Sequence, residues 1–378
     1  MLLRITIPSF VILVSFLIFS LIANVYAEQN EEQVKMEFQL QDLEDLVGNY
    51  NINQDSSSLT TNNKNIAFVL PSFTMAAYDN SFYLFFGKYE GIVKKFEKTR
   101  IKENITSDLN LLSSRVPEKA ESFLNHKSLA LHYLAKHISD LSPTTNINFL
   151  TDEQVHEGLI FNSDNQNNYN VIILGHQEYV TQQEYDNFKR FVENGGILIL
   201  LDANMFYAEV DYDSTNNKIT LVKGHFFAFD GEKAWPDVKE RWAAETTEWV
   251  GSNFGCGSCT ITFGNNPFQY THYEEQYITN PNAKILIDYQ AKSDYNYLIG
   301  AYELNYKLGK VVSFGIFGEK VVRNNNFLDF FDNILIENEI IANSIPTPQQ
   351  EQQQISQADT LSEIPFSSGT TISPRSLN

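Results

Sequence analysis

The sequence predicts an α/β protein built on a doubly wound, mostly parallel sheet, with an aromatic-rich lobe inserted after its central strands. Short, wholly apolar runs recur along the chain, and such runs are typical of strands buried on both faces. Segments with a helical apolar period separate them, so strands and helices alternate as in doubly wound folds. The wholly apolar runs are residues 66–70, 171–174 and 197–201, and residues 147–150, interrupted by Asn148, form a fourth strand-like segment.

The N-terminus has the pattern of a secretory signal peptide. Residues 1–27 contain one basic residue, Arg4, then an apolar run, and end in Val25-Tyr26-Ala27, with small residues at the positions that signal peptidase requires. An uncleaved membrane anchor is the alternative, because the run approaches the ~18–20 residues needed to span a bilayer. Both interpretations predict a secreted or extracytoplasmic protein. Residues 28–65 are polar and are predicted to form a linker.

The predicted α/β domain covers residues 66–343. Its first strand, residues 66–70, leads into an aromatic and polar loop over residues 71–83 that carries Tyr78 and Tyr83. Asn104 begins an Asn-Ile-Thr triplet, a glycosylation sequon. Residues 118–139 have a helical pattern, and residues 147–150 form the next strand.

A strand–helix–strand unit over residues 171–204 is the best-defined part of the pattern. Thr181 occupies an N-cap position, with Glu184 three residues later as in a capping box. The helix ends at Gly195-Gly196, and residues 197–201 form the second strand. The unit therefore brings His176-Gln177-Glu178-Tyr179 and Asp202-Ala203-Asn204 to the carboxyl edge of the sheet, where open α/β sheets bind ligands.

Beyond this unit the composition changes. A strand is predicted over residues 218–222, and residues 224–280 form the inserted lobe, which holds all three tryptophans and both cysteines. Further strands are predicted over residues 284–288, 298–304 and 311–314, and a closing helix over residues 326–341. Residues 344–378 are of low complexity and are predicted to be disordered.

The charge balance excludes several classes of partner. The chain has 27 Lys and Arg against 47 Asp and Glu, a formal net charge of −20. Such a chain is poorly suited to binding nucleic acid or anionic lipid. We therefore expect no nucleic-acid partner, and contact with a membrane only through an uncleaved N-terminal segment.

The two cysteines, Cys256 and Cys259, stand in a Cys-Gly-Ser-Cys sequence. In an exported protein we interpret them as a short-range disulfide that holds a loop. A thioredoxin-like redox pair would need the motif between a strand and a helix start, and a zinc site would need two more ligands.

The residues at the predicted edge combine an imidazole, carboxylates, an amide and phenols. They are contributed by His176, Glu178, Asp202, Asn204 and the pair Tyr78 and Tyr83. This combination suits a site for a hard cation or general acid–base catalysis. The structural alternative is that Glu178 and Tyr179 cap the following helix and that Asn204 closes a turn.

Two motifs carry a resemblance to a known family. Leu174-Gly175-His176-Gln177 matches the elbow of class I glutamine amidotransferases, but Ile173 occupies the position of the nucleophilic cysteine, so thiolate chemistry is impossible there. Together with Thr74-Met-Ala-Ala-Tyr78-Asp-Asn80 and residues 195–204, this segment resembles the C-terminal domain of the N,N-dimethylformamidase large (beta) subunit. The resemblance covers roughly residues 65–341 and implies a three-layer, glutamine-amidotransferase-like or flavodoxin-like fold without the cysteine triad.

The resemblance also implies roles for individual residues. It makes Glu178 and Tyr78 ligands of iron, or of another hard divalent or trivalent cation. His176 becomes an acid–base or orienting group, and Asn204 an amide that polarises the substrate. The second tyrosine ligand of the family has no matching motif here; Tyr83 is the candidate, with Tyr89 also available. Glu275, in His-Tyr-Glu-Glu, is a further acid that the lobe would contribute.

Two functions follow as hypotheses. The first is an exported, metal-dependent hydrolase of the C–N bond of a small amide. The second is a non-catalytic binding domain at the cell surface, with a glycan as its ligand; it predicts that the oxygens of Tyr78 and Glu178 lie more than about 6 Å apart, too far to share an ion. A structural component of an envelope assembly, clamped by its disulfide, is a third and weaker interpretation.

Overall fold

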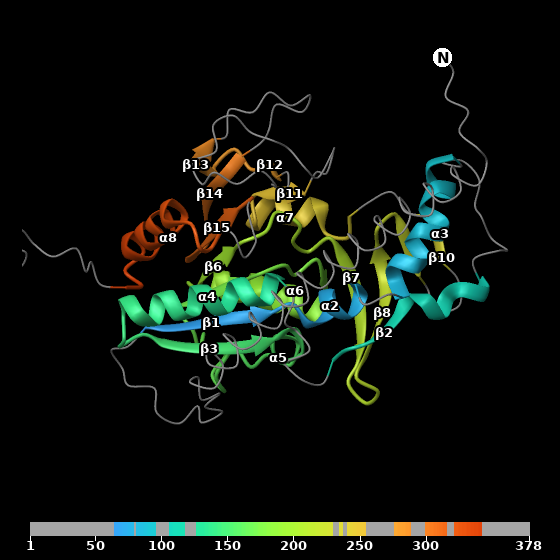
Figure 1. Ribbon diagram of the computed structural model, residues 1–378, viewed down its shortest axis with the longest axis horizontal. Coiled ribbons are helices and arrows are strands. Elements are labelled where there is room, and N and C mark those ends of the chain that lie inside the picture. Colours follow the sequence, from blue (N-terminus) through green and yellow to red (C-terminus); the bar gives the residue numbers. More distant parts are fainter. Residues whose placement is uncertain are drawn as a thin grey trace, which may run out of the picture.

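The computed structural model describes residues 64–78, 81–95, 106–117, 126–229, 234–236, 240–254, 276–288, 299–315 and 321–341. The predictions for the signal peptide, most of the linker, Asn104, Cys256, Cys259, Glu275 and the C-terminal tail lie outside these residues. The described part is an α/β structure with mixed sheets (Figure 1). It contains no helix long and apolar enough to cross a membrane.

Seven of the described strands form the main sheet, in the order β13-β14-β15-β6-β4-β1-β3. The pairs from β15 to β3 are parallel, whereas β13 and β14 run antiparallel to their neighbours. The sheet is therefore mixed, with a continuous parallel part. Its strands are β1 (Asn65–Leu70), β3 (Asn146–Thr151), β4 (Val171–Leu174), β6 (Ile197–Leu200), β13 (Lys284–Asp288), β14 (Ile299–Tyr306) and β15 (Gly309–Phe314).

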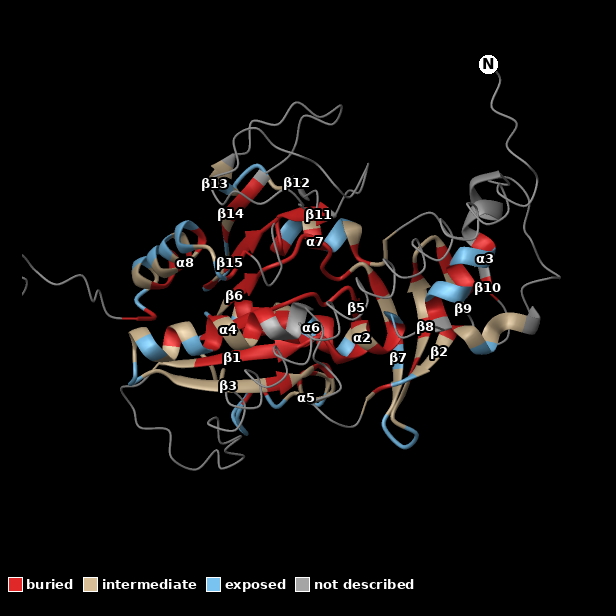
Figure 2. Cartoon of the chain, viewed as in Figure 1, coloured by how far each residue is buried: buried red, intermediate tan, exposed pale blue. Residues whose placement is uncertain are grey.

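Helices pack on both faces of this sheet, which explains why its central strands β4 and β6 are apolar throughout. Ile66 and Phe68 of β1 share one core with α4 (His126–Leu141) and α8 (Asn325–Glu337). Ala67 and Val69 face the opposite side, because successive side chains of a strand alternate. They share a second core with α5 (Asp152–His156), α6 (Gln182–Glu193) and α7 (Ala243–Trp249). Figure 2 shows β1 as mostly buried, whereas β3 at the edge of the sheet is mostly intermediate.

A second sheet stands beside the carboxyl end of the first (Figure 1). Its order is β10-β9-β8-β7-β5, with β2 paired to β8. Residues 175–178 lead directly from β4 in the main sheet to β5 in the second. The strands are β2 (Ser113–Arg115), β5 (Tyr179–Val180), β7 (Ala208–Asp213), β8 (Lys218–Gly224), β9 (Phe227–Phe229) and β10 (Ala234–Pro236). Strands β11 (Ser252–Phe254) and β12 (Gln276–Ile278) form a separate pair.

Residues 71–83, predicted to be a loop, are largely helical instead. They contribute α2 (Ser72–Tyr78) and the start of α3 (Ser81–Lys95), which is followed by the 3-10 helix η1 (Thr106–Leu112). The Met75 N–H donates to the Pro71 carbonyl over 2.9 Å and closes the first turn of α2. Apolar side chains at helical spacing then enter a third core against the second sheet, which offsets the cost of ordering the segment. They include Phe73, Ala76, Ala77, Phe82, Phe85, Phe86 and Tyr89.

Candidate active site

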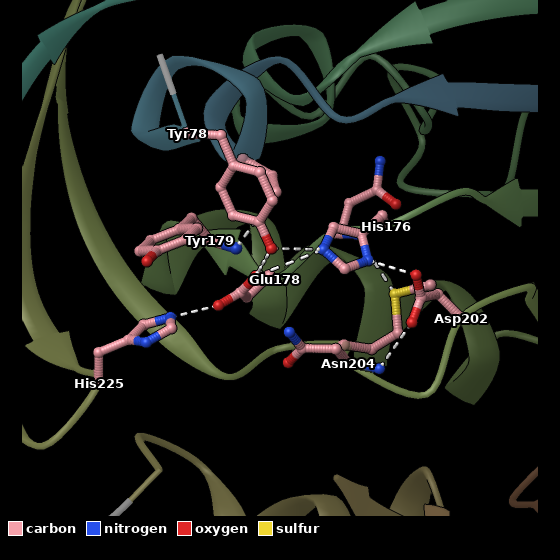
Figure 3. Close-up of polar contacts among 10 residues, drawn as sticks. Tyr78, His176, Glu178, Tyr179, Asp202, Asn204 and His225 are labelled. Carbon is pink, nitrogen blue, oxygen red and sulfur yellow. Dashed lines mark hydrogen bonds and ion pairs between the residues drawn. The ribbon is translucent and has the colours of Figure 1, made fainter. Parts of the chain in front are cut away.

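The motif His176-Gln177-Glu178 crosses from the main sheet to the second sheet and is fully buried. It follows β4, whose last residue is Leu174, and ends where β5 begins. The Glu178 backbone is held firmly, because its carbonyl accepts the N–H groups of Tyr207 over 3.0 Å and of Ala208 over 2.9 Å. Figure 3 shows the side chains of His176 and Glu178 turned toward each other and toward Tyr78.

Tyr78 meets both residues of the motif. Its hydroxyl donates a hydrogen bond to Oε2 of Glu178 and lies 2.9 Å from Nε2 of His176. That imidazole nitrogen is also 3.3 Å from the same carboxylate oxygen. Although Tyr78 is 40% exposed overall, its hydroxyl end therefore lies against two buried side chains. Three residues predicted to form a site do come together.

Asp202 orients His176 from the opposite side. This residue follows β6, and its Oδ2 bonds to Nδ1 of the imidazole, so that Nε2 faces Tyr78 and Glu178. Its Oδ1 accepts the backbone N–H of Asn204 over 3.0 Å. A carboxylate on the second ring nitrogen is the usual device that fixes the orientation of a functional histidine.

His225 is a member of the site that the sequence analysis missed. Its Nε2 bonds to Oε1 of Glu178, from the turn between β8 and β9. Each oxygen of the Glu178 carboxylate therefore has a partner of its own: His225 on one, Tyr78 and His176 on the other.

These neighbours determine the charge of Glu178. Burial alone would raise the pKa of the carboxyl group, but the charge of His225 and the hydrogen bonds from His176 and His225 reverse that effect. The pKa of Glu178 accordingly lies well below its usual range, and the group is ionised. Burial, and next the negative charge of Glu178, raise the pKa of Tyr78 far above its usual range, so the phenol keeps its proton.

Tyr83 and Asn204 lie at the margin of this cluster. The Tyr83 ring stands edge-on to that of Tyr78, with centroids 4.8 Å apart, and 41% of its surface is exposed. Asn204 is buried, and its Oδ1 has no hydrogen-bond partner. In Figure 3 the Asn204 side chain extends toward the Glu178 side of the cluster. An unpaired buried amide oxygen is costly unless a ligand satisfies it.

A second group of buried carboxyls lies nearby at the same sheet edge. Asp152 begins α5 and accepts hydrogen bonds from the Phe73 N–H over 2.8 Å and from Nε2 of Gln177 over 3.3 Å. Burial, together with the charge of Glu153, raises the pKa of Asp152 to about 8. Burial and the charge of Asp152 raise the pKa of Glu184 well above its usual value. Asp152 and Glu184 therefore keep their protons at pH values where Glu178 is ionised.

The donor atoms around Glu178 are suited to a metal ion. Among the residues that the structure describes, no three His, Cys, Asp or Glu side chains are placed to hold a metal together. Among the described residues Tyr78 offers a donor of another kind, and its hydroxyl already contacts Glu178. A buried, ionised carboxylate next to a phenol whose proton a cation would replace is a donor pair that fits a hard or borderline cation.

Comparison with solved structures gives weak likenesses. A catalytic mutant of Gan42B, a GH42 beta-galactosidase from G. stearothermophilus, has 12% identity and a TM-score of 0.37, over 74% of this chain and 30% of that one. A ThuA-like protein from Bacteroides uniformis has 13% identity and a TM-score of 0.31, over 75% of this chain and 92% of that one. The chain thus spans less than a third of the galactosidase that it matches. No curated protein matches the chain.

The comparison with protein families gives a definite result. The family described as N,N-dimethylformamidase beta subunit-like, C-terminal, matches residues 27–283, which is more than half of the 378 residues. The matched region includes Tyr78, His176, Glu178 and His225. The resemblance inferred from the sequence motifs is thereby confirmed, and the chain belongs to the N,N-dimethylformamidase beta subunit-like, C-terminal family.

Proposed function

We propose that this chain is an exported, metal-dependent hydrolase that cleaves the C–N bond of small amides. The observation that carries the proposal is the bond between the Tyr78 hydroxyl and Oε2 of Glu178. A binding domain without an ion predicts that these oxygens lie more than about 6 Å apart, and they are in contact instead. Family membership favours the same conclusion.

The fold proposed for this enzyme is the amidotransferase-like one. The parallel strands from β15 to β3, with helices on both faces, support a doubly wound, three-layer arrangement. The site then lies at the carboxyl edge, where such sheets bind ligands.

Tyr78 and Glu178 would hold the ion, which is iron or another hard cation. The resemblance implies a second tyrosine ligand, for which Tyr83 is the candidate. When bound, the ion would supply Lewis acidity toward the amide carbonyl and toward water. His176 moves a proton at Nε2, from the attacking water to the leaving amine nitrogen, and Asp202 keeps the ring in place. Asn204 binds the amide group of the substrate through its unpaired side-chain oxygen.

The test combines metal analysis with an activity assay. The full chain is purified, its metal content is measured, and amine release from small formamides and acetamides is followed. We expect bound metal and turnover in the wild type, and loss of both in Glu178→Gln. Glu184→Gln is the matched control, because it makes the same substitution at an equally buried glutamate of the neighbouring carboxyl group. A folded wild type that binds no added metal and releases no amine would refute the proposal in favour of the binding domain.

A further inference from the structure

We propose that His225 is a protein ligand of the metal site and that it, in place of Tyr83, completes the set begun by Tyr78 and Glu178. The site would then take a divalent cation of borderline softness. This inference rests on the proposed function, because it concerns the ligands of the same ion. Four observations carry it: a contact, a ring stack, a backbone conformation and a charge count.

The contact places His225 on the second oxygen of the ligand carboxylate. Nε2 of His225 bonds to Oε1 of Glu178, whereas the Tyr78 hydroxyl bonds to Oε2. A nitrogen and a phenol oxygen, both able to bind a metal, are thus already within bonding reach of Glu178. Tyr83, by comparison, stands with its ring edge-on to those of Tyr78 and His225, both of which bond to the Glu178 carboxylate.

The ring stack fixes the plane of the imidazole. His225 stacks on Tyr179, with centroids 5.3 Å apart and planes 8° apart, and on Phe86, at 4.6 Å and 19°. Tyr207 meets it edge-on at 4.9 Å. A side chain that its neighbours hold in one orientation is preorganised, as a metal ligand must be.

The backbone at His225 is strained in a way that aims this side chain at Glu178. Gly224 pairs with Phe227, which leaves His225 and Phe226 as a two-residue hairpin turn, with φ values of 48° and 68°. Asn-Gly is the favoured sequence for such a turn, because both residues are left-handed. Gly224 itself has φ 148°, and a Cβ there would lie 2.3 Å from Cβ of Ala208, so the turn is pressed against β7. Strain of this kind is concentrated at functional sites.

The charge count distinguishes the two candidate ligand sets. A phenolate, a carboxylate and a neutral imidazole carry two negative charges, which balance a divalent ion. Two phenolates and a carboxylate carry three, which balance a trivalent ion. Imidazole nitrogen is a good ligand for zinc, cobalt and ferrous iron, whereas an all-oxygen anionic set favours harder ions. His225 in the third position therefore shifts the preference of this chain toward divalent ions.

The experiment titrates the metal-free full chain separately with Zn²⁺, Co²⁺ and Fe³⁺ and follows binding by calorimetry and, for Co²⁺ and Fe³⁺, by visible absorption. The main variants are His225→Asn and His225→Gly, because both residues suit the positive φ of the turn. We expect Zn²⁺ and Co²⁺ affinity to fall at least ~100-fold in both, with thermal stability equal to or above that of the wild type. Tyr83→Phe should change affinity by about twofold or less, and His137→Ala, on α4, not at all.

His225→Tyr gives a gain-of-signal test. A second phenolate at this position should turn the preference toward Fe³⁺ and produce a visible charge-transfer band. If the wild type binds metal but loses it in Tyr83→Phe and keeps it in His225→Asn and His225→Gly, the inference is wrong and the proposed function stands. If the wild type binds none of the three ions, the proposed function is wrong as well.

Discussion

Two groups of buried carboxyls at the same sheet edge are held in opposite charge states. Glu178 is completely buried and ionised, whereas Asp152 and Glu184 are as deeply buried and have raised pKa values. The cost of burial acts in the same direction on all three. The difference comes from the neighbours, because Glu178 contacts two imidazoles, while Asp152 and Glu184 have other carboxyls beside them.

Gln177 separates the two groups. It lies between His176 and Glu178 in sequence, yet its Nε2 turns away to bond the Val69 carbonyl over 2.9 Å and Asp152 over 3.3 Å. Neighbouring residues of one motif thus contribute to two electrostatic environments. We infer that the first environment binds a cation, while the second is a neutral, proton-holding part of the core.

The largest effect is expected from Glu178→Gln. A neutral amide cannot supply the anionic oxygens, so metal affinity should fall by roughly 1,000-fold or more. Calorimetric titration with the preferred ion measures this loss. An equal loss of metal affinity in Glu184→Gln would contradict the distinction between the two carboxyl groups, because Glu178 and the Asp152–Glu184 pair would then behave as one site.

Asp202→Asn should have the next largest effect. Asparagine keeps the shape of the side chain but no longer offers a charged acceptor to Nδ1 of His176, so the ring loses its fixed orientation. We expect a 10- to 100-fold drop in kcat/KM for amide hydrolysis, a loss typical of groups that orient a functional histidine. A much smaller change in KM than in kcat would identify Asp202 as a positioning residue. Equal kcat values in variant and wild type would exclude that role.

The second group predicts a pH dependence of stability. A carboxyl whose pKa rises from an ordinary ~4 to about 8 on folding binds more protons in the folded than in the unfolded state. Its stabilising effect is complete below pH ~4 and is lost as the pH rises through about 8. Glu184→Gln removes one titrating group, together with the repulsion that the charge of Asp152 exerts on it, so it should raise stability at pH 8 by roughly 1–3 kcal/mol and flatten the profile.

Thermal melts of wild type and Glu184→Gln between pH 4.5 and 8.5 measure this difference. Asp186→Asn, on the same helix, is the control, and it should follow the wild-type curve. Parallel curves for wild type and Glu184→Gln would show that the pair is not a proton-holding group.

The smallest effect on folding is expected from Asn204→Ala. The Asn204 side-chain oxygen has no partner, so its removal should change the free energy of unfolding by about 0.5 kcal/mol or less. Amide turnover should nevertheless fall, because the group proposed to bind substrate is gone. Urea unfolding and amine release, measured on the same preparation, separate the two effects. Unchanged turnover would remove Asn204 from the site.

The sequence predicted the strands of the main sheet well, because strands buried on both faces are apolar throughout. The runs at residues 66–70, 171–174 and 197–201 coincide with β1, β4 and β6 to within one residue. The N-cap at Thr181 is confirmed, since its hydroxyl accepts the Glu184 N–H over 3.0 Å. Such features depend on local pattern alone.

The second sheet was harder to predict because its strands are half exposed or short. Strand β7 reads Ala-Glu-Val-Asp-Tyr-Asp, and its alternation of buried Ala208 and Val210 with polar residues was a signal that the sequence analysis did not use. His225 stands 47 residues after Glu178, and a hairpin turn of this sheet brings it there. Sequence spacing gives no measure of that approach. The one local signal was a glycine followed by two aromatic rings between two strand-like runs.

The passage of residues 175–178 from β4 to β5 has a mechanical consequence. His176 and Glu178 lie on the segment that joins the two sheets, whereas His225 is carried by a hairpin of the second sheet alone. A cation bound by both Glu178 and His225 would link that hairpin to residues 175–178, and this cross-link would be lost when the ion is removed. Loading the site should therefore slow hydrogen exchange in β8 and β9 while leaving β1 and β3 unchanged. Hydrogen-exchange rates in the β8–β9 hairpin would then report whether the site holds a cation.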